Sequence, residues 1–139
     1  MSRVTDEQLV KQAFLAREKA YAPYSRFRVG AALLTAEGTV YTGCNIENAA
    51  YTPTNCAERT AFFKAVSEGE RDFAAIAIVG GKEGAGHPGL CAPCGVCRQV
   101  MQEFCSQKEF RIILAETETT YQSFTLEELL PLGFGPDNL

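Results

Sequence analysis

Basic residues are neither abundant nor clustered in this chain. It carries 13 lysines and arginines against 17 aspartates and glutamates, which gives a formal net charge of −4 at pH 7. Proteins that bind a phosphate backbone concentrate Lys and Arg on one face. We therefore expect no nucleic-acid partner, while a small uncharged ligand stays possible.

Long hydrophobic runs are also missing. No window approaches the roughly 18 continuous apolar residues that a membrane helix needs, so we expect no membrane association. The opening residues, Met1 to Glu7, are not followed by the apolar stretch of a secretion signal. These absences predict a cytoplasmic protein.

Histidine is nearly absent, and cysteine is not. The single histidine, His87, lies among glycine and proline, where we expect it to be solvated rather than to bind a metal. In a reducing compartment, cysteines are buried thiols or metal ligands more often than disulfides. We expect ordinary buried thiols at Cys44 and Cys105. A metal-binding interpretation applies to the other four, which are Cys56, Cys91, Cys94 and Cys97.

The length and the apolar content predict one domain covering residues 1–139. At 139 residues and 46% hydrophobic content, the chain can form one core but not two ordinary domains. Apolar periodicity predicts helices and strands in the order α-β-β-α-β-α-β-β-α. We expect an α/β fold, a three-layer α/β/α sandwich around a mixed five-stranded sheet. The helices are expected at about 5–20, 55–68, 93–105 and from 125, and the strands at 28–35, 40–44, 73–79, 110–115 and 120–124.

Local signals mark several of these elements. Thr5-Asp-Glu-Gln8 and Thr125-Leu-Glu-Glu128 have the form of helix capping boxes. Pro93 suits the first position of its helix. Gly30, followed by two alanines, predicts close packing of the strand by a helix or by a ligand.

Three cysteines have the spacing of a catalytic metal site. Cys94 and Cys97 are three residues apart and share one face of a helix. Cys56 stands at the start of another expected helix, where the dipole and the free N–H groups favour a thiolate. Three ligands leave one position of a tetrahedral zinc open for water, whose pKa zinc can lower to about 7. We expect one Zn²⁺ per chain.

Two charged residues follow Cys56 closely. On a regular helix Glu58 would point about 200° away from Cys56, so both face a metal only if Cys56 lies in the first, irregular turn. Glu58 could then move protons between the zinc-bound water and a leaving group. Arg59 could offset the negative charge of three thiolates by a hydrogen bond to a sulfur.

Other interpretations of these residues stay open. Cys91 forms a second CxxC pair with Cys94, which would suit a structural site with four cysteines, and core thiols without metal are a third option. Glu58 could be the acid of a capping box with Asn55.

Asn45 and Glu47 follow the second expected strand. If the strand continues, the two side chains point the same way, and an amide with a carboxylate can grip a vicinal diol. The alternative is a polar strand end that precedes a loop.

Four blocks of residues carry a family resemblance over nearly the whole chain. The blocks are Tyr24-Ser-Arg-Phe-Arg-Val-Gly-Ala-Ala32, Gly43-Cys-Asn-Ile-Glu-Asn-Ala-Ala-Tyr51, Cys56-Ala-Glu-Arg59 with Pro93-Cys-Gly-Val-Cys-Arg-Gln99, and Leu129-Leu-Pro-Leu-Gly-Phe-Gly-Pro136. Taken in this order, they resemble the zinc nucleoside deaminases, specifically the small homotetrameric cytidine deaminases. One departure is Arg28, where members of that family often have proline.

The resemblance implies a reaction and the residues that perform it. Zinc would be held by Cys56, Cys94 and Cys97, with Arg59 compensating the charge. A zinc-bound hydroxide would attack C4 of free cytidine or deoxycytidine. Glu58 would pass the proton to N3 and then to the amine, so that ammonia leaves and uridine or deoxyuridine forms.

The same resemblance implies the substrate contacts and the assembly. Asn45 and Glu47 would bind the ribose hydroxyls, Phe27 would stack on the pyrimidine, and the backbone at Ala57 would help to hold the base. Tyr51 and Phe134 resemble positions that reach into the active site of a neighbouring subunit. This implies a homotetramer with shared active sites.

Two other functions remain to be compared with this one. A deaminase of a related nucleoside, a nucleoside antibiotic or a nucleotide would share the chemistry, although Glu47 would repel a phosphate. A non-catalytic structural zinc module would need four cysteine ligands.

Overall fold

The computed structural model describes residues 3–84 and 89–139, so the prediction for His87 lies outside the described residues. Among the described residues, no helix combines the length and the apolar character needed to cross a bilayer. The elements in chain order are α1 (Asp6–Arg17), β1 (Phe27–Thr35), β2 (Val40–Cys44), α2 (Ala57–Ser67), β3 (Phe73–Lys82), α3 (Gly95–Phe104), β4 (Arg111–Ala115), β5 (Tyr121–Thr125), α4 (Leu126–Leu129) and a terminal 3₁₀ turn, η1 (Pro136–Asn138).

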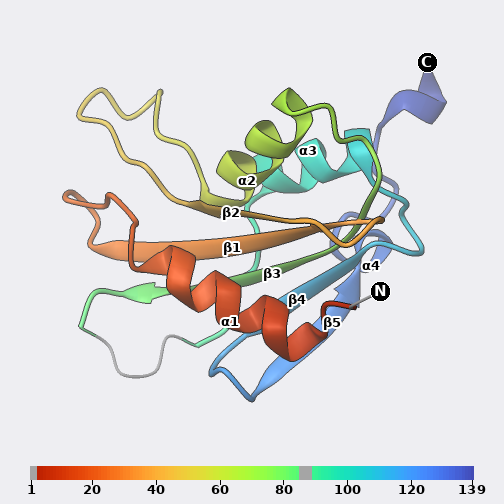
Figure 1. Ribbon diagram of the computed structural model, residues 1–139. Helices are drawn as coiled ribbons and strands as arrows, with labels where there is room; N and C mark the ends of the chain where they lie inside the picture. Colours follow the sequence, from red (N-terminus) through yellow and green to blue (C-terminus); the bar gives the residue numbers. More distant parts are fainter. Residues whose placement is uncertain (1–2, 85–88) are drawn as a thin grey trace.

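The five strands form one mixed sheet in the order β2-β1-β3-β4-β5 (Figure 1). β3 and β4 are parallel, and the other neighbouring pairs are antiparallel. β1 and β2 form the hairpin that the short glycine-containing turn between them predicts. The predicted mixed five-stranded sheet is confirmed.

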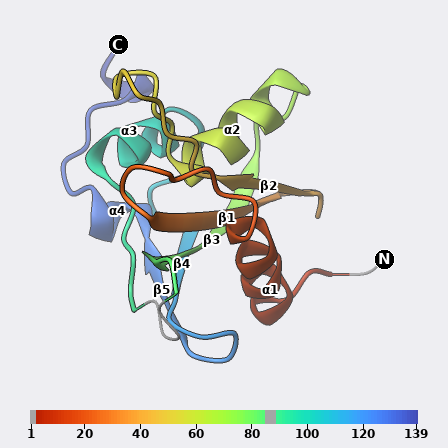
Figure 2. The ribbon, with the colours of Figure 1, turned by 90° about the vertical axis from the view of Figure 1, so that its left-hand side faces the viewer.

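Helices cover both faces of the sheet. α1 lies on one face, while α2 and α3 lie side by side on the other (Figure 2). Side chains of β1 alternate between the two cores: Leu33 packs on the side of α2 and α3, and Leu34 packs on the side of α1. Burial on both faces explains the continuous apolar run of this strand and confirms the three-layer sandwich.

Two helix starts follow the sequence, and one does not. Thr5 and Thr125 both cap their helices with reciprocal capping boxes, as expected. α3, however, begins at Gly95, because Cys94 is its N-cap residue with an extended backbone (φ −69°, ψ 168°). Pro93 therefore precedes the helix, and its predicted place at the first helical position is wrong.

Gly30 on β1 is packed directly against α1. A Cβ atom at this position would lie 2.1 Å from the carbonyl oxygen of Ala13 and 2.4 Å from the backbone nitrogen of Arg17. Of the two partners that the sequence predicts for this glycine, the helix is the one found. The contact lets α1 lie close to the sheet.

The substitution Gly30→Ala is expected to lower the free energy of unfolding by about 3 kcal/mol, because the new methyl group meets helix backbone that cannot rotate away. The melting temperature should fall by about 10 °C. Gly95→Ala makes the same chemical change where no atom lies within 4 Å and should leave the melting temperature nearly unchanged. Equal melting temperatures for the two variants would contradict the close helix–strand contact.

Candidate active site and metal centre

Two helix N-termini position the three predicted metal ligands. Cys56 is the N-cap residue of α2, with an extended backbone (φ −76°, ψ 155°). Cys94 caps α3 in the same way, and Cys97 lies in the first turn of that helix, where it is buried. This is the irregular first turn that the sequence requires if Cys56 and Glu58 are to serve one site.

The three sulfurs have the separation that a zinc ion needs. Their Sγ atoms all lie within 4.8 Å of one another, and those of Cys56 and Cys94 are 3.7 Å apart. Sulfurs bound tetrahedrally to zinc at about 2.3 Å are separated by about 3.8 Å. Soft thiolates are also the ligands that zinc prefers. The donor set and its geometry therefore fit a zinc site with Cys56, Cys94 and Cys97 as ligands.

Cys91 does not belong to this group of sulfurs. Its thiol packs against Gly80, where an added Cβ atom would lie 2.7 Å from the sulfur. Burial raises the pKa of the Cys91 thiol to about 11, and its sulfur is not among the three that lie within 4.8 Å of one another. The four-cysteine structural site finds no support in this geometry.

Replacing Cys91 by serine is therefore expected to leave the zinc content at about one per chain, because none of the three clustered sulfurs is touched. Metal analysis of the purified variant by mass spectrometry measures this directly. A zinc content near zero in Cys91→Ser would show that Cys91 is a ligand after all.

Arg59 supplies the positive charge of the site. Its Nη2 atom donates a hydrogen bond to Cys56 Sγ at 3.2 Å. Burial alone would lower the pKa of the Arg59 guanidinium, but its hydrogen bonds to Cys56 and Cys97 raise it overall. A proton shared with Cys97 lowers the pKa of the Cys56 thiol, with help from Arg59, and raises the pKa of Cys97. The guanidinium thus stabilises a thiolate at the helix terminus.

Glu58 is a buried carboxyl group beside the three sulfurs, with only 4% of its surface exposed. Burial raises its pKa to about 7, which suits a group that both takes up and releases protons near neutrality. The alternative role in a capping box with Asn55 is wrong, since Cys56 is the cap residue and the Asn55 amide instead donates to Thr60 Oγ1 at 3.2 Å.

One cavity of about 270 Å³ brings most of the predicted site together. Glu58 and the sulfurs of Cys56 and Cys94 line the cavity from the N-termini of α2 and α3. Ala57, the first residue of α2, also lines it. The other predicted residues in the lining come from β1 and from the segment after β2. The lining includes Phe27, Asn45, Glu47, Cys56, Ala57, Glu58, Cys91 and Cys94.

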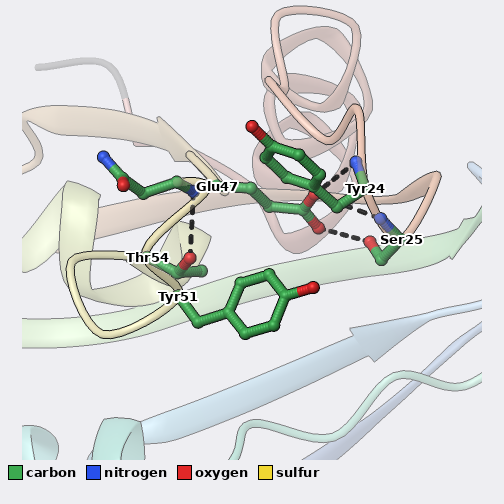
Figure 3. A pocket seen from close by; sticks show the side chains of 6 residues that line it. Tyr24, Ser25, Glu47, Tyr51 and Thr54 are labelled. Carbon is green, nitrogen blue, oxygen red and sulfur yellow. Dashed lines mark hydrogen bonds between the residues drawn. The ribbon is translucent and has the colours of Figure 1, made fainter.

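Four predicted residues do not line this cavity: Cys97, Arg59 and the two aromatic residues Tyr51 and Phe134. Tyr51 lines a neighbouring cavity of about 400 Å³, where its ring meets that of Tyr24 edge-on at a centroid distance of 6.3 Å (Figure 3). Phe134 lies on the C-terminal segment, and its carbonyl accepts a hydrogen bond from Gln99 Nε2 at 2.8 Å. Both rings are largely exposed, at 72% and 60%.

Asn45 and Glu47 both line the cavity, but they do not lie on one continuing strand as the sequence predicted. β2 ends at Cys44, and beyond it Ile46 forms only isolated bridges, so no continuous strand carries the pair. Asn45 is held by β1: its Oδ1 accepts from the backbone N–H of Val29 at 2.9 Å, and its Nδ2 donates to the carbonyl of Phe27 at 2.8 Å.

Glu47 is held by the segment that precedes β1. Its Oε1 accepts from the backbone N–H groups of Tyr24 (2.9 Å) and Ser25 (3.2 Å), and its Oε2 accepts from the Ser25 hydroxyl (Figure 3). The Ser25 hydroxyl is the main cause of the lowered pKa of Glu47. Ser25 was not among the predicted site residues, although it stands in the first block of the family resemblance, two residues before Phe27, and lines the cavity.

The chain is similar to known proteins over nearly its whole length. A family model described as the cytidine and deoxycytidylate deaminase zinc-binding region matches residues 3–113. The chain belongs to this zinc-binding cytidine deaminase family. A cytidine deaminase of Sporosarcina psychrophila is 50% identical over 133 residues, which cover 96% of this chain and 93% of that protein.

Solved structures of the family have the same fold. The crystal structure of a cytidine deaminase from Burkholderia pseudomallei is 48% identical, with a TM-score of 0.84 over 94% of this chain and 99% of that one. A cytidine deaminase structure from Mycobacterium tuberculosis is 39% identical, with a TM-score of 0.79 over 94% and 98% of the two chains. The predicted family, fold and three-cysteine zinc site are therefore confirmed.

Proposed function

We propose that this chain is a zinc-dependent hydrolase that converts free cytidine and deoxycytidine to uridine and deoxyuridine. The observation that carries the proposal is a single cavity lined both by the buried carboxyl group of Glu58, beside the zinc-binding thiols, and by the polar side chains of Asn45 and Glu47, which suit a sugar. Membership of the cytidine deaminase family supports the same conclusion.

The residues around the thiols divide the chemistry between them. Zinc held by Cys56, Cys94 and Cys97 acts as a Lewis acid that makes water reactive at neutral pH. Arg59 keeps the Cys56 sulfur anionic through its hydrogen bond. A zinc ion and the Arg59 guanidinium would together neutralise the three thiolates, and such a neutral site suits an uncharged pyrimidine.

Glu58 is the proposed proton carrier. As the oxygen of water bonds to C4 of the pyrimidine, Glu58 accepts the water's proton and delivers it to N3. It then takes the second proton from the new hydroxyl group to the exocyclic amine. The C4–N bond breaks, ammonia leaves, and a carbonyl remains at C4.

Phe27 and Ala57 are the proposed base contacts. The Phe27 ring lines the cavity and offers a face on which a pyrimidine stacks. Ala57 is the first residue of α2, where the backbone N–H groups have no partner within the helix and can bond to the ring's polar edge.

Asn45 and Glu47 are the proposed sugar contacts. The hydrogen bonds they already make limit how many further hydrogen bonds they can form with a ligand. Glu47 already uses three of the roughly four acceptor positions of a carboxylate. Asn45 uses one of its two amide protons and one lone pair. What remains is one amide proton of Asn45 and one acceptor position on each residue, enough to bind a hydroxyl as both donor and acceptor. The 3′-hydroxyl is such a group and is common to ribose and 2′-deoxyribose. This capacity supports activity on both nucleosides.

The assembly and the location belong to the same proposal. The chain is proposed to be a single domain, residues 1–139, that forms a homotetramer with shared active sites. The exposed rings of Tyr51 and Phe134 support this, because each is free to enter a neighbouring copy's pocket. All six cysteines are free, which suits the reducing cytoplasm. Native mass spectrometry tests the assembly.

An assay of cytidine consumption tests the proposed reaction. Loss of the cytidine absorbance with one ammonia released per nucleoside is expected from protein that carries one zinc per chain. Cytidine monophosphate should react far more slowly, since Glu47 repels its phosphate. Zinc-loaded protein that releases no ammonia from cytidine or deoxycytidine would refute the proposal and leave a related nucleoside, a nucleoside antibiotic or a non-catalytic zinc module to be tested.

A further inference from the structure

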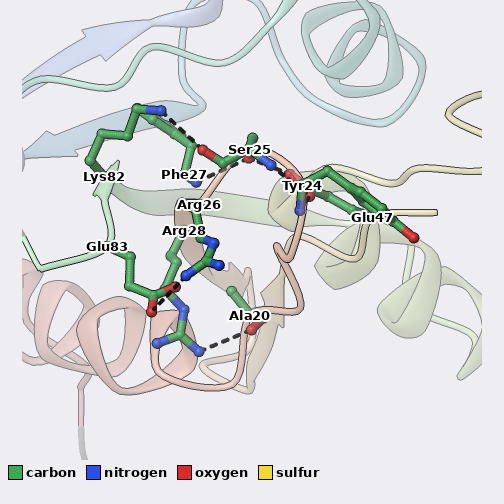
Figure 4. A network of polar contacts seen from close by, with 9 residues as sticks. All are labelled: Ala20, Tyr24, Ser25, Arg26, Phe27, Arg28, Glu47, Lys82 and Glu83. Carbon is green, nitrogen blue, oxygen red and sulfur yellow. Dashed lines mark hydrogen bonds and ion pairs between the residues drawn. The ribbon is translucent and has the colours of Figure 1, made fainter. Parts of the chain in front are cut away.

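We propose that Ser25 is a positioning residue that orients the sugar-binding carboxylate of Glu47. The inference rests on the proposed function and adds to it a residue that does not touch the reacting atoms. It is carried by one chain of hydrogen bonds, which runs from strand β1 through the Ser25 hydroxyl to Glu47 (Figure 4).

The direction of each bond in this chain is fixed by the groups that take part. Ser25 Oγ accepts the backbone N–H of Phe27 at 3.0 Å, and this amide can only donate. The lowered pKa of Glu47 keeps it an anion, which can only accept. The single hydroxyl proton of Ser25 therefore points to Glu47 Oε2, and the hydroxyl has one orientation.

Strand β1 anchors this chain of bonds. Phe27 is paired with Lys82 of β3 in the sheet register, and its carbonyl accepts from the Asn45 amide. The backbone of Phe27 is thus fixed even without Ser25. The hydroxyl transmits this fixed position to the Glu47 carboxylate, whose own backbone lies outside any regular strand and is held by an N–H bond to the Tyr21 carbonyl at 2.8 Å.

Side chains from β1 and β3 hold the segment that carries Ser25. Lys82 Nζ donates to the Ser25 carbonyl oxygen at 3.0 Å. Arg28 Nη2 donates to the carbonyl oxygens of Glu18 (2.9 Å) and Ala20 (3.0 Å), where α1 has ended (Figure 4). A proline in place of Arg28 would make neither bond. The segment between α1 and β1 is therefore tied down on both sides of Ser25.

The bonds also determine which acceptor of Glu47 is left for a ligand. Both backbone N–H groups bond to Oε1, and the Ser25 hydroxyl bonds to Oε2. One acceptor position on Oε2 stays available, and its direction is set by the hydroxyl beside it. Without Ser25 Oγ, only the two backbone bonds to Oε1 restrain the carboxylate, so Oε2 is less well oriented and the sugar meets a less ordered partner.

Steady-state kinetics of Ser25→Ala and Ser25→Thr test the inference. Ser25→Ala should raise KM for cytidine about tenfold, the loss expected when one hydrogen bond to a charged group is removed, and kcat should change by less than about twofold. Ser25→Thr keeps the hydroxyl and should return KM to within about threefold of the original. Ser67→Ala, which removes an exposed serine hydroxyl at the end of α2, is the matched control and should change neither constant.

A double-mutant cycle separates positioning from a general structural effect. If Ser25 acts through Glu47, Ser25→Ala added to Glu47→Ala should change KM by less than about twofold. The same tenfold loss in both backgrounds, or a fall in kcat at constant KM, overturns the inference.

A second variant covers the case in which Ser25→Ala does not fold. Lys82→Met removes only the ammonium that holds the Ser25 carbonyl. It should raise KM for cytidine about threefold, and this effect should vanish in the Glu47→Ala background. An effect that persists in that background refutes the inference. Absence of cytidine turnover by the unaltered protein would instead refute the proposed function.

Discussion

Replacing Glu58 by glutamine is expected to lower kcat for cytidine by about 10²- to 10⁴-fold while one zinc per chain stays bound. The size follows from the contribution of a positioned general acid and base. Glutamine keeps the shape of this buried side chain, so the cavity and the three sulfurs should be undisturbed. Single-turnover assays with metal analysis of the same sample measure both quantities.

Glu103→Gln is the matched control for this experiment. Glu103 is an exposed residue on α3, and the same change there should leave kcat and zinc content as they were. If Glu58→Gln retained full activity, Glu58 could not be the proton carrier, whatever the metal content.

The second large effect is expected from Cys97→Ala, which should reduce the zinc content below about a tenth per chain and abolish deamination. Cys97 is the most deeply buried of the three ligands, and two remaining thiols cannot complete a tetrahedral site. The melting temperature should also fall, because the binding free energy of the metal contributes to folding.

Cys105→Ala separates the loss of metal from the loss of packing. The Cys105 thiol packs against the same core as Cys97 but lies outside the sulfur cluster. This variant should keep its zinc and its activity with only a modest drop in melting temperature. A Cys97→Ala protein with a full complement of zinc would exclude Cys97 as a ligand.

The fold and the metal site were largely predictable from the chain. Continuous apolar runs such as the one around Leu33 require burial on both sides of a strand, which gives the three layers. The condition placed on Cys56, that it lie in an irregular first turn, followed from helix geometry alone and is met. These features depend on local spacing, which a sequence states directly.

The hydrogen bonds that hold Asn45 and Glu47 in place could not be predicted in the same way. Glu47 is held by Tyr24 and Ser25, which meet it only because α1 and β1 bring their connecting segment beside the end of β2. Two of these bonds come from backbone N–H groups, and every residue except proline carries one. A sequence therefore gives no sign of which amide will be used.

The role of the exposed Tyr51 and Phe134 rings could not be predicted from patterns within the chain either. Tyr51 and Phe134 lie at the surface of this single chain, so their proposed contact with a pocket depends on a second copy. Family resemblance named them, and no periodicity or spacing within the chain could have done so. Their role stays a prediction until the assembly is measured.

The two helices that carry the ligands begin without the hydrogen bond that usually secures such an end. Neither Cys56 nor Cys94 makes a side-chain bond to the amides of its first turn, a contact that usually contributes about 1 kcal/mol. A metal bound to both sulfurs fastens these ends instead, so zinc acts as a common cap for α2 and α3. Chelation would then fray the first turns of both helices and speed amide exchange there, while the central sheet kept its protection. The ion that activates water would also keep the walls of its own cavity in place.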